Sequence, residues 1–335
     1  MNKDKPTLVA LVLAALAGLC SAALVSAETT LKASHQWPGG KGDLRDEMVQ
    51  IIASDMNAAD LGVRIQVYPG SSLYKAKEQW DAIVKGQLDI TAFPLDYAGG
   101  RHPEFNLTLM PGLVKSHDHA RRLNNSDFMK RIRKIMEDEG VIVLADTWLA
   151  GGFTSKKRCI LEPDDVKGQT LRAAGRAFEQ MLAAAGASIS SMPSSEIYSG
   201  LQTGVLDGAN TSSASLVSYR IYEQVTCLTA PGENALWFMY EPILMSRKSF
   251  DALSKEQQEV ILQAGKKAEV YAYEKAKEAD QNLVNTFTRQ GVKVVNMTPE
   301  QTAMWRKIAD ESSYKNFSDN VPGGRELLDM ALSVE

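Results

Sequence analysis

The sequence predicts an α/β protein of two lobes, in which two mixed or mostly parallel sheets are joined by crossing strands and by one long helix. Strand and helix patterns alternate with short connections over 30–94, as in a mostly parallel sheet covered by helices on both faces. Two further apolar segments, 141–155 and 227–247, can pass from one sheet to the other. A helix expected over 254–288 would be about 50 Å long, which exceeds the width of a typical single domain.

The first lobe is expected to be built from the alternating strands and helices. The chain from Thr30 opens with a short strand that ends at Pro38-Gly39-Gly40. Asp43 can cap a helix whose apolar residues fall on one face; they are Leu44, Met48, Ile51, Ile52 and Met56. A strand over 63–70, a helix over 75–85 and a buried strand over 87–94 follow.

The second lobe follows the first crossing segment. A helix is expected over 121–139, and the apolar segment 141–155 is then a strand that crosses between the lobes. Residues 168–213 supply the α/β core of the second lobe, and 227–247 form the return crossing. Ser254 caps the long helix. The last elements are a strand over 292–299 and surface helices over 299–331.

These elements divide the chain into two discontinuous lobes. We expect the first lobe to comprise 28–150 and 232–275, and the second to comprise 151–231 and 276–335. In open α/β sheets, ligands bind beyond the carboxyl ends of the strands. The cleft between the lobes is therefore the expected binding site.

Residues 1–27 have the features of a cleaved signal peptide. Lys3 and Lys5 give a positively charged start, Leu8–Cys20 is a 13-residue apolar run, and Val25-Ser26-Ala27 supplies small residues for cleavage. A membrane-spanning helix needs about 20 apolar residues, so this run is expected to be removed. The mature protein should then be soluble and periplasmic.

Composition and charge restrict the class of protein. Of the 335 residues, 44% are hydrophobic and 23% are charged, which is ordinary for globular domains. A net charge of −4 provides no basic face for nucleic acid. Cys159 and Cys227 remain after removal of the signal peptide. In an oxidising compartment they can form a disulfide, or they can stay as separate buried thiols.

Arg172 is the leading candidate for a ligand-binding residue. It follows a short strand pattern, at a point where a helix begins. A guanidinium is planar and matches a carboxylate with two hydrogen bonds. Asn210 and Thr211 end another predicted strand of the same lobe and can donate to the same anion. The alternatives are a structural salt bridge for Arg172 and a turn role for Asn210.

Aromatic residues recur at the ends of the predicted strands. Rigid aromatic rings line apolar ligand pockets, although they also pack in cores and hinges. His35 beside Trp37 is either a ligand donor or a structural loop histidine. The aromatic residues at these strand ends are Trp37, Phe93, Tyr97, Trp148, Phe153, Trp237 and Tyr240, and all but Tyr97 are taken as candidates for the pocket.

Signatures of catalysis and of metal or cofactor binding are missing from the sequence. It contains no G-x-S-x-G, H-E-x-x-H or G-x-G-x-x-G motif. His117 and His119 have no third metal ligand at a useful spacing, and Glu196 near Tyr198 has no activated nucleophile beside it. We expect a binding protein without cofactor or metal, not an enzyme.

Three segments resemble the solute-binding proteins of tripartite ATP-independent periplasmic (TRAP) transporters, over nearly the whole mature chain. They are YPGSSLYKAKEQWDAIVKGQLDI (68–90), LRAAG (171–175) and MPSSEIYSGLQTGVLDGANTS (192–212). The resemblance implies a two-lobed protein that closes on an organic acid. It also implies delivery of that acid to small and large membrane subunits, with an ion gradient driving uptake.

The resemblance also implies roles for individual residues. Arg172 matches the arginine that clamps the substrate carboxylate, and Asn210 or Thr211 matches an assisting amide. Ser194 matches a pocket position before the glutamate of the motif, and Phe93 and Pro94 match the first-lobe loop.

The crossing strand departs from the family pattern. Many relatives carry a second arginine there, whereas 148–155 read WLAGGFTS. The missing cation and the nearby Trp148 and Phe153 favour a monocarboxylate with an apolar or aromatic body over a dicarboxylate. We expect a monomeric transport component. The alternatives are a sensor that presents the acid to a signalling receptor, and a secreted hydrolase or lyase.

Overall fold

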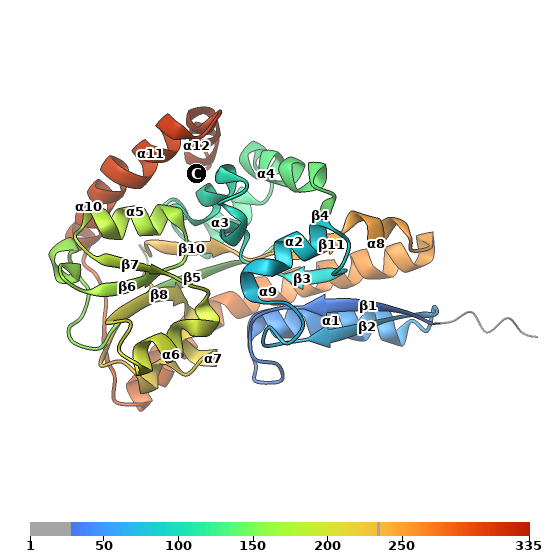
Figure 1. Cartoon of the computed structure of the whole chain (residues 1–335), viewed down its shortest axis with the longest axis horizontal. Coiled ribbons are helices and arrows are strands. Elements are labelled where there is room, and N and C mark those ends of the chain that lie inside the picture. The colour runs from blue at the N-terminus through green and yellow to red at the C-terminus, as the bar shows by residue number, and fades with distance from the viewer. Residues whose placement is uncertain (1–27, 233–234) are drawn as a thin grey trace, which may run out of the picture.

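A computed structural model describes residues 28–232 and 235–335. The predicted signal peptide, 1–27, lies outside these residues. The described chain forms two sheets side by side, each packed with helices (Figure 1). The predicted α/β class with two mixed sheets is confirmed.

The first sheet has five strands in the order β2-β1-β3-β11-β4. β1 is parallel to β2 and β3, while β11 is antiparallel to both β3 and β4. β11 comes from a later part of the chain than the other four strands. This sheet is therefore complete only after the chain has returned from the second sheet. The strands are β1 (Thr29–Ser34), β2 (Val63–Tyr68), β3 (Ile90–Ala92), β4 (Val141–Ala145) and β11 (Ile243–Ser246).

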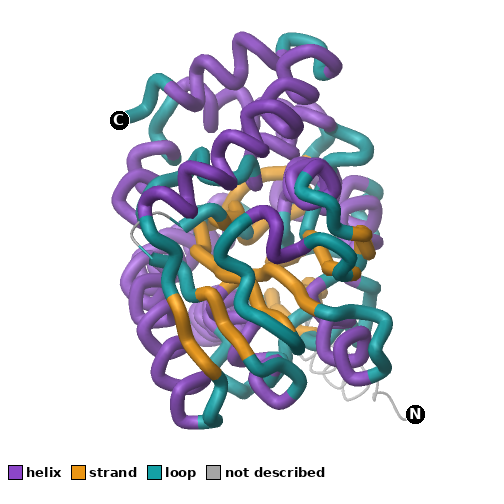
Figure 2. The backbone as a smooth tube through the Cα atoms, turned by 90° about the vertical axis from the view of Figure 1, so that its left-hand side faces the viewer, coloured by secondary structure: helices purple, strands orange, loops and turns teal. Residues whose placement is uncertain are grey.

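The second sheet has the order β12-β9-β5-β8-β6-β7, with β10 paired to β5. β6 is parallel to β7 and β8, while β5 is antiparallel to β8, β9 and β10. Figure 2 views the molecule from this side, where strands lie between helices. The strands are β5 (Trp148–Ser155), β6 (Thr170–Ala173), β7 (Ser188–Ser191), β8 (Gly208–Ser212), β9 (Cys227–Thr229), β10 (Trp237–Tyr240) and β12 (Lys293–Val295).

Twelve α-helices lie within the described part of the chain, with shorter 3₁₀ turns between them. They are α1 (Leu44–Ala58), α2 (Gln79–Val84), α3 (His117–Leu123), α4 (Asp127–Asp138), α5 (Arg176–Ala184), α6 (Ile197–Gln202), α7 (Ser213–Ser218), α8 (Arg247–Asp251), α9 (Lys255–Arg289), α10 (Pro299–Ala309), α11 (Lys315–Asn320) and α12 (Gly324–Leu332). As predicted, Asp43 caps α1, because its side chain accepts a hydrogen bond from the Arg45 amide.

The segment 141–155, predicted as one crossing strand, is two strands in different sheets. β4 ends at Ala145 in the first sheet and β5 begins at Trp148 in the second. The return passes between β10 and β11 through Glu241-Pro242, and the Glu241 amide donates to the Thr147 carbonyl, 2.9 Å away. The chain therefore passes from one sheet to the other at these two links, and not at the expected lobe boundaries 150/151 and 231/232. β10 belongs to the second sheet because it pairs with β5.

The long helix α9 spans both sheets, as its length predicted. Ser254 and Gln257 form its capping box. Along its length α9 packs on α1 and β4 and then on α7, β5 and β12. Gly265 lies where α9 passes β4, and a Cβ there would overlap the Leu144 carbonyl. None of the described helices is both long enough and apolar enough to cross a membrane.

The helical predictions failed at one place. The segment 121–139 is not one helix but two, α3 and α4, separated after Leu123. Ser126 interrupts the pattern because its side chain accepts from the Met129 amide and so caps α4. The predicted C-terminal helices pack on both lobes, with α10 on α5 and α12 on α4, and form an arc over the molecule (Figure 1).

Cys159 and Cys227 form a disulfide, with their Cα atoms 5.2 Å apart and a sequence separation of 68. Of the two alternatives left open by the sequence, the structure shows the bonded one. Cys227 lies on β9, so the bond fastens the segment after β5 to the second sheet.

We expect Cys159→Ser with Cys227→Ser to lower the melting temperature of the mature protein. Loss of the cross-link raises the conformational entropy of the unfolded chain. For a loop of this length, this lowers the free energy of unfolding by up to about 4 kcal/mol. Thermal unfolding followed by circular dichroism measures the change. Because the bond lies within one lobe, ligand affinity should be unchanged; an unchanged melting temperature would contradict the prediction.

Candidate functional site

Arg172 lies at the carboxyl end of β6, between the parallel strands β7 and β8. Its side chain is buried, with the residue 1% exposed. Nε donates to the Met192 carbonyl at 2.9 Å, and Nη1 donates to the Asn210 carbonyl at 2.7 Å. The two neighbouring strands thus hold the guanidinium over the end of β6.

The guanidinium of Arg172 is buried without a carboxylate among its hydrogen-bond partners. Its third partner is the Tyr97 hydroxyl, 3.0 Å from Nη2, so all three acceptors are neutral oxygens. A guanidinium has about five N–H donors, which leaves one on Nη1 and one on Nη2. Burial of a charge without a hydrogen-bonded counter-ion is costly, and an anionic ligand would lower that cost.

Tyr97 brings the first lobe onto this site. It belongs to the 3₁₀ turn η2 (Leu95–Ala98), which follows β3 directly. Its hydroxyl also accepts from the Ser194 amide at 3.0 Å, and the Gln36 amide nitrogen lies 3.5 Å away. Sequence reasoning gave Tyr97 no polar role; its place at the end of a buried strand was the available signal.

The strand register separates the two predicted helpers of Arg172. Arg172 pairs with Ala209, and side chains alternate along a strand, so Thr211 lies on the Arg172 face of the sheet. Asn210 pairs with Phe153 and lies on the opposite face. The side-chain amide of Asn210 is buried and has no hydrogen-bond partner among the described residues. Asn210 therefore meets Arg172 through its carbonyl.

Three further predicted residues lie at the edge of the site, Phe93 and Pro94 from the first lobe and Ser194 from the second. Phe93 follows β3 directly, and its ring lies 6.1 Å from that of Tyr97, edge to face. Ser194 is buried and holds Tyr97 through its backbone amide. Arg172, Ser194, Phe93 and Pro94 therefore surround Tyr97.

A second buried guanidinium, Arg45, lies in the same cleft and was missed by sequence reasoning. Nε and Nη2 donate to the Asp43 carboxylate, and Nη1 donates to Glu241 at 2.7 Å. Nη1 also reaches Ser212 and Nη2 reaches Ser215, at 2.9 and 3.1 Å. With all of its N–H donors occupied, Arg45 cannot also bind a ligand carboxylate.

Arg45 perturbs its two carboxylates differently. Burial alone would raise the pKa of Asp43, but the charge and hydrogen bonds of Arg45 hold that pKa below its usual value. Burial raises the pKa of Glu241, and a single contact with Arg45 offsets only part of the increase. Asp43 is thus the stronger ion-pair partner of Arg45, and Glu241 is the weaker one.

His35 and Trp37 support this network from the first lobe. The His35 Nε2 and Asp46 Oδ1 atoms are 3.0 Å apart, both fully buried. The Arg45 guanidinium lies 4.1 Å from the centre of the Trp37 ring, and Trp37 Nε1 donates to Ser215 of the second lobe at 3.3 Å. Both residues therefore order the cleft around Arg45 rather than around Arg172.

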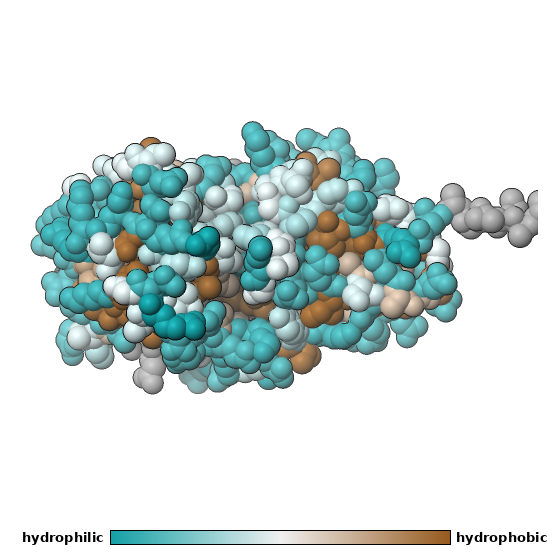
Figure 3. Space-filling model, turned by 90° about the horizontal axis from the view of Figure 1, so that it is seen from below, coloured by the Kyte–Doolittle hydropathy of each residue, from teal (hydrophilic) through white to brown (hydrophobic). Residues whose placement is uncertain are grey.

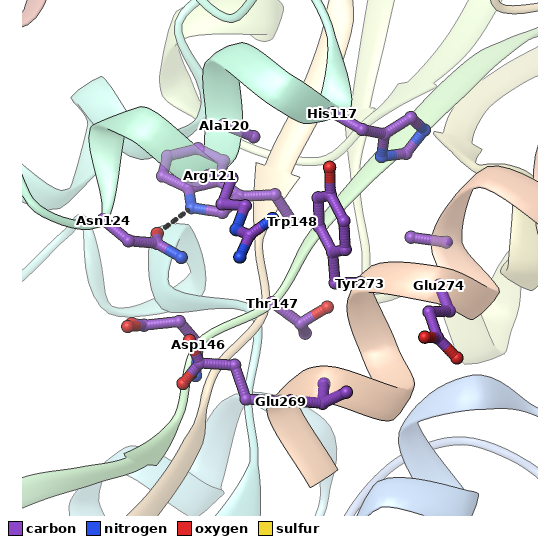
Figure 4. A pocket seen from close by; sticks show the side chains of 12 residues that line it. His117, Ala120, Arg121, Asn124, Asp146, Thr147, Trp148, Glu269, Tyr273 and Glu274 are labelled. Carbon is purple, nitrogen blue, oxygen red and sulfur yellow. Dashed lines mark hydrogen bonds between the residues drawn. The ribbon is translucent and has the colours of Figure 1, made fainter. Parts of the chain in front are cut away.

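Trp148 and Tyr240 lie at the crossing segments, away from Arg172. Their rings are 5.0 Å apart, and Trp148 Nε1 donates to Asn124 at 2.8 Å. Trp148 lines a separate cavity of about 280 Å³ between α3, the β4–β5 link and α9 (Figure 4). Arg121 and Tyr273 also enter this cavity.

Phe153 and Trp237 also lie outside the Arg172 site. Phe153 stacks on Trp305 of α10, with ring centres 5.6 Å apart. Both Phe153 and Trp237 line a hollow against the C-terminal segment. The structure therefore places four of the predicted aromatic residues in packing between segments.

The surface between the lobes is hollowed in the view from below, with apolar residues in its depth (Figure 3). Within 28–232 and 235–335, no cluster of three His, Cys, Asp or Glu side chains is arranged to hold a metal ion. The arrangement around Arg172 consists of a cation, hydroxyls and amides, which suits recognition of an anion.

Comparison with known proteins assigns the chain to a family. The family model DctP, described as bacterial extracellular solute-binding protein, family 7, matches residues 54–320. The chain belongs to this family. A solute-binding protein of Albidiferax ferrireducens is 37% identical over 92% of this chain and 93% of its own length. The sialic acid-binding periplasmic protein SiaP of Vibrio cholerae is 26% identical over 92% and 94%.

Solved structures of family 7 proteins agree with this fold. A TRAP periplasmic solute-binding protein of Rhodoferax ferrireducens, solved with bound malonate, superposes with a TM-score of 0.87 at 37% identity, covering 91% of this chain and 98% of the other. A TRAP protein of Sulfurospirillum deleyianum with bound succinate has a TM-score of 0.84 at 25% identity, covering 92% and 100%.

The two buried arginines predict opposite effects on stability. Arg45→Met should destabilise the protein by about 3–5 kcal/mol, because it leaves two buried carboxylates without a partner. Arg172→Met should cost much less, since the three hydrogen bonds that it removes go to neutral oxygens and no hydrogen-bonded carboxylate loses its partner. Urea unfolding without ligand measures both. Equal losses in the two variants would contradict this contrast.

Proposed function

We propose that this family 7 protein is the periplasmic solute-binding component of a TRAP transporter, and that it binds a small organic acid through one carboxylate at Arg172. The acid is held between the lobes and passed to small and large membrane subunits. Binding occurs without turnover and without a cofactor.

One observation supports this function most directly: Arg172 is buried with only neutral partners and with two N–H groups left over. Those two groups, on Nη1 and Nη2, are the pair that a carboxylate accepts from side by side. Thr211, on the same sheet face, and the Tyr97 hydroxyl are the neighbouring donors for its oxygens.

Closure of the lobes is part of the proposal. Tyr97 belongs to the first lobe, whereas Arg172 and Ser194 belong to the second. The Tyr219 hydroxyl of the second lobe also donates to the Gln36 carbonyl of the first, at 2.8 Å. An acid that contacts both sides favours the closed form, because a ligand shifts a conformational equilibrium by its difference in affinity for the two states.

The site supports recognition of one carboxylate. Arg45, the other buried guanidinium of the cleft, already has Asp43, Glu241 and two serine hydroxyls as partners. The malonate-bound relative makes dicarboxylates the natural comparison, so malonate and propionate should be tested together. The expectation of an aromatic body rested on Trp148 and Phe153; since both pack away from Arg172, we propose only a monocarboxylate.

A thermal-shift screen of small organic acids should identify ligands, and Arg172→Lys should weaken their binding by about 10- to 100-fold. Lysine keeps the charge but loses the planar fork, and each lost charge-assisted bond is worth about 1.5–3 kcal/mol. Arg172→Ala should weaken the binding of these acids further than Arg172→Lys does. Isothermal titration calorimetry gives the affinities, with the exposed Arg325→Lys as a matched control. Unchanged affinity in Arg172→Ala would refute the site.

Binding should also make the protein more compact. Small-angle scattering of the mature protein should show a smaller radius of gyration at a saturating concentration of an acid found in the screen. Arg172→Ala at the same concentration should keep the ligand-free value. Identical scattering with and without a tightly bound acid would argue against closure.

A further inference from the structure

Asp96 is a buried carboxyl group without a hydrogen-bond partner within 28–232 and 235–335. It lies on η2, next to Tyr97, and is 4% exposed. Neither Oδ1 nor Oδ2 has a hydrogen-bond partner among the described residues. Buried polar groups are almost always paired, so this carboxyl requires an explanation.

Other buried carboxyls of the cleft show what a structural role looks like. Asp43 is paired with Arg45, and Asp46 accepts from the Gly40 amide at 2.8 Å and lies 3.0 Å from His35. Asp96 has no such partner, although it is as deeply placed. A carboxyl kept only for stability would be replaced favourably by an apolar residue.

Asp96 lies at the contact between the lobes. Its carboxyl faces Gly175 of the second lobe, the residue before α5, and a Cβ at position 175 would overlap Asp96 Oδ2. The charges around it come from both lobes: Arg172 and Glu179 from the second, and Lys77 from the first. Burial raises the pKa of Asp96 and Glu179 adds to the increase, while Arg172 and Lys77 oppose it.

A cavity of about 240 Å³ adjoins Asp96 and begins next to Arg172 in the chain, at Ala173. Its walls include Tyr97 and Met192, which are both hydrogen-bonded to Arg172. Lys77 and Ser191 stand at its side, with the Lys77 ammonium 3.4 Å from the Ser191 hydroxyl. An acid held at Arg172 would extend past Tyr97 towards Asp96.

We propose that Asp96 determines specificity, and that the ligand is a monocarboxylic acid with a hydroxyl or ammonium group for Asp96 to accept from. This rests on the proposed function of Arg172. The ligand's donor supplies the partner that the Asp96 carboxyl lacks among the described residues. An unsubstituted acid leaves Asp96 unpaired.

Two acid series of matched chain length test this proposal. The first is propionate, 3-hydroxypropionate and 3-aminopropionate; the second is butyrate, 4-hydroxybutyrate and 4-aminobutyrate. In at least one series, a substituted acid should bind the mature protein about 10- to 100-fold more tightly than its parent, as expected for a hydrogen bond to a charged group. Calorimetry measures each Kd.

Asp96→Ala should remove this preference while leaving the unsubstituted acid bound through Arg172. The control is Asp127→Asn, whose aspartate side chain is 80% exposed on α4, and it should keep the preference. The proposal is overturned if parent and substituted acids bind wild type equally, if the preference survives in Asp96→Ala, or if no member of either series binds. Loss of parent-acid binding in Arg172→Ala tests the proposed function separately.

Discussion

A buried guanidinium needs compensation, and the cleft of this protein contains two that meet this need differently. Arg45 has every donor filled by protein groups, so it joins α1, the return crossing and α7 into one network. Arg172 is held in place by two backbone carbonyls and a tyrosine hydroxyl, none of which carries a charge. The first arginine links segments of both lobes, and the second is the group to which we assign anion binding.

The connections between the lobes are of two kinds. The crossing links at Asp146-Thr147 and Glu241-Pro242 are short and tied together by a backbone hydrogen bond, which suits a hinge. The long helix α9 and the C-terminal helices contact both lobes over extended surfaces. Packed helices and the polar contacts of Tyr97, Tyr219 and Trp37 therefore join the lobes in this structure.

The sequence predicted the fold from periodic elements and the site from strand ends. The proximity of Arg172 and Asn210 could be predicted because a parallel βαβ unit brings strand ends to one edge, whereas Ser194 was expected only from the family resemblance. The face of each side chain could not be predicted, since it depends on register: Asn210 and Thr211 are adjacent in sequence, yet they lie on opposite faces. Arg45 was missed because Glu241, Ser212 and Ser215 are 167 to 196 residues away from it in sequence.

The close approach of Asp96 to Gly175 restricts which residue can stand before α5. A Cβ at position 175 would overlap Asp96 Oδ2, so any residue larger than glycine would push η2 of the first lobe and the start of α5 in the second lobe apart. Glycine at this position therefore allows two segments of different lobes to lie in close contact.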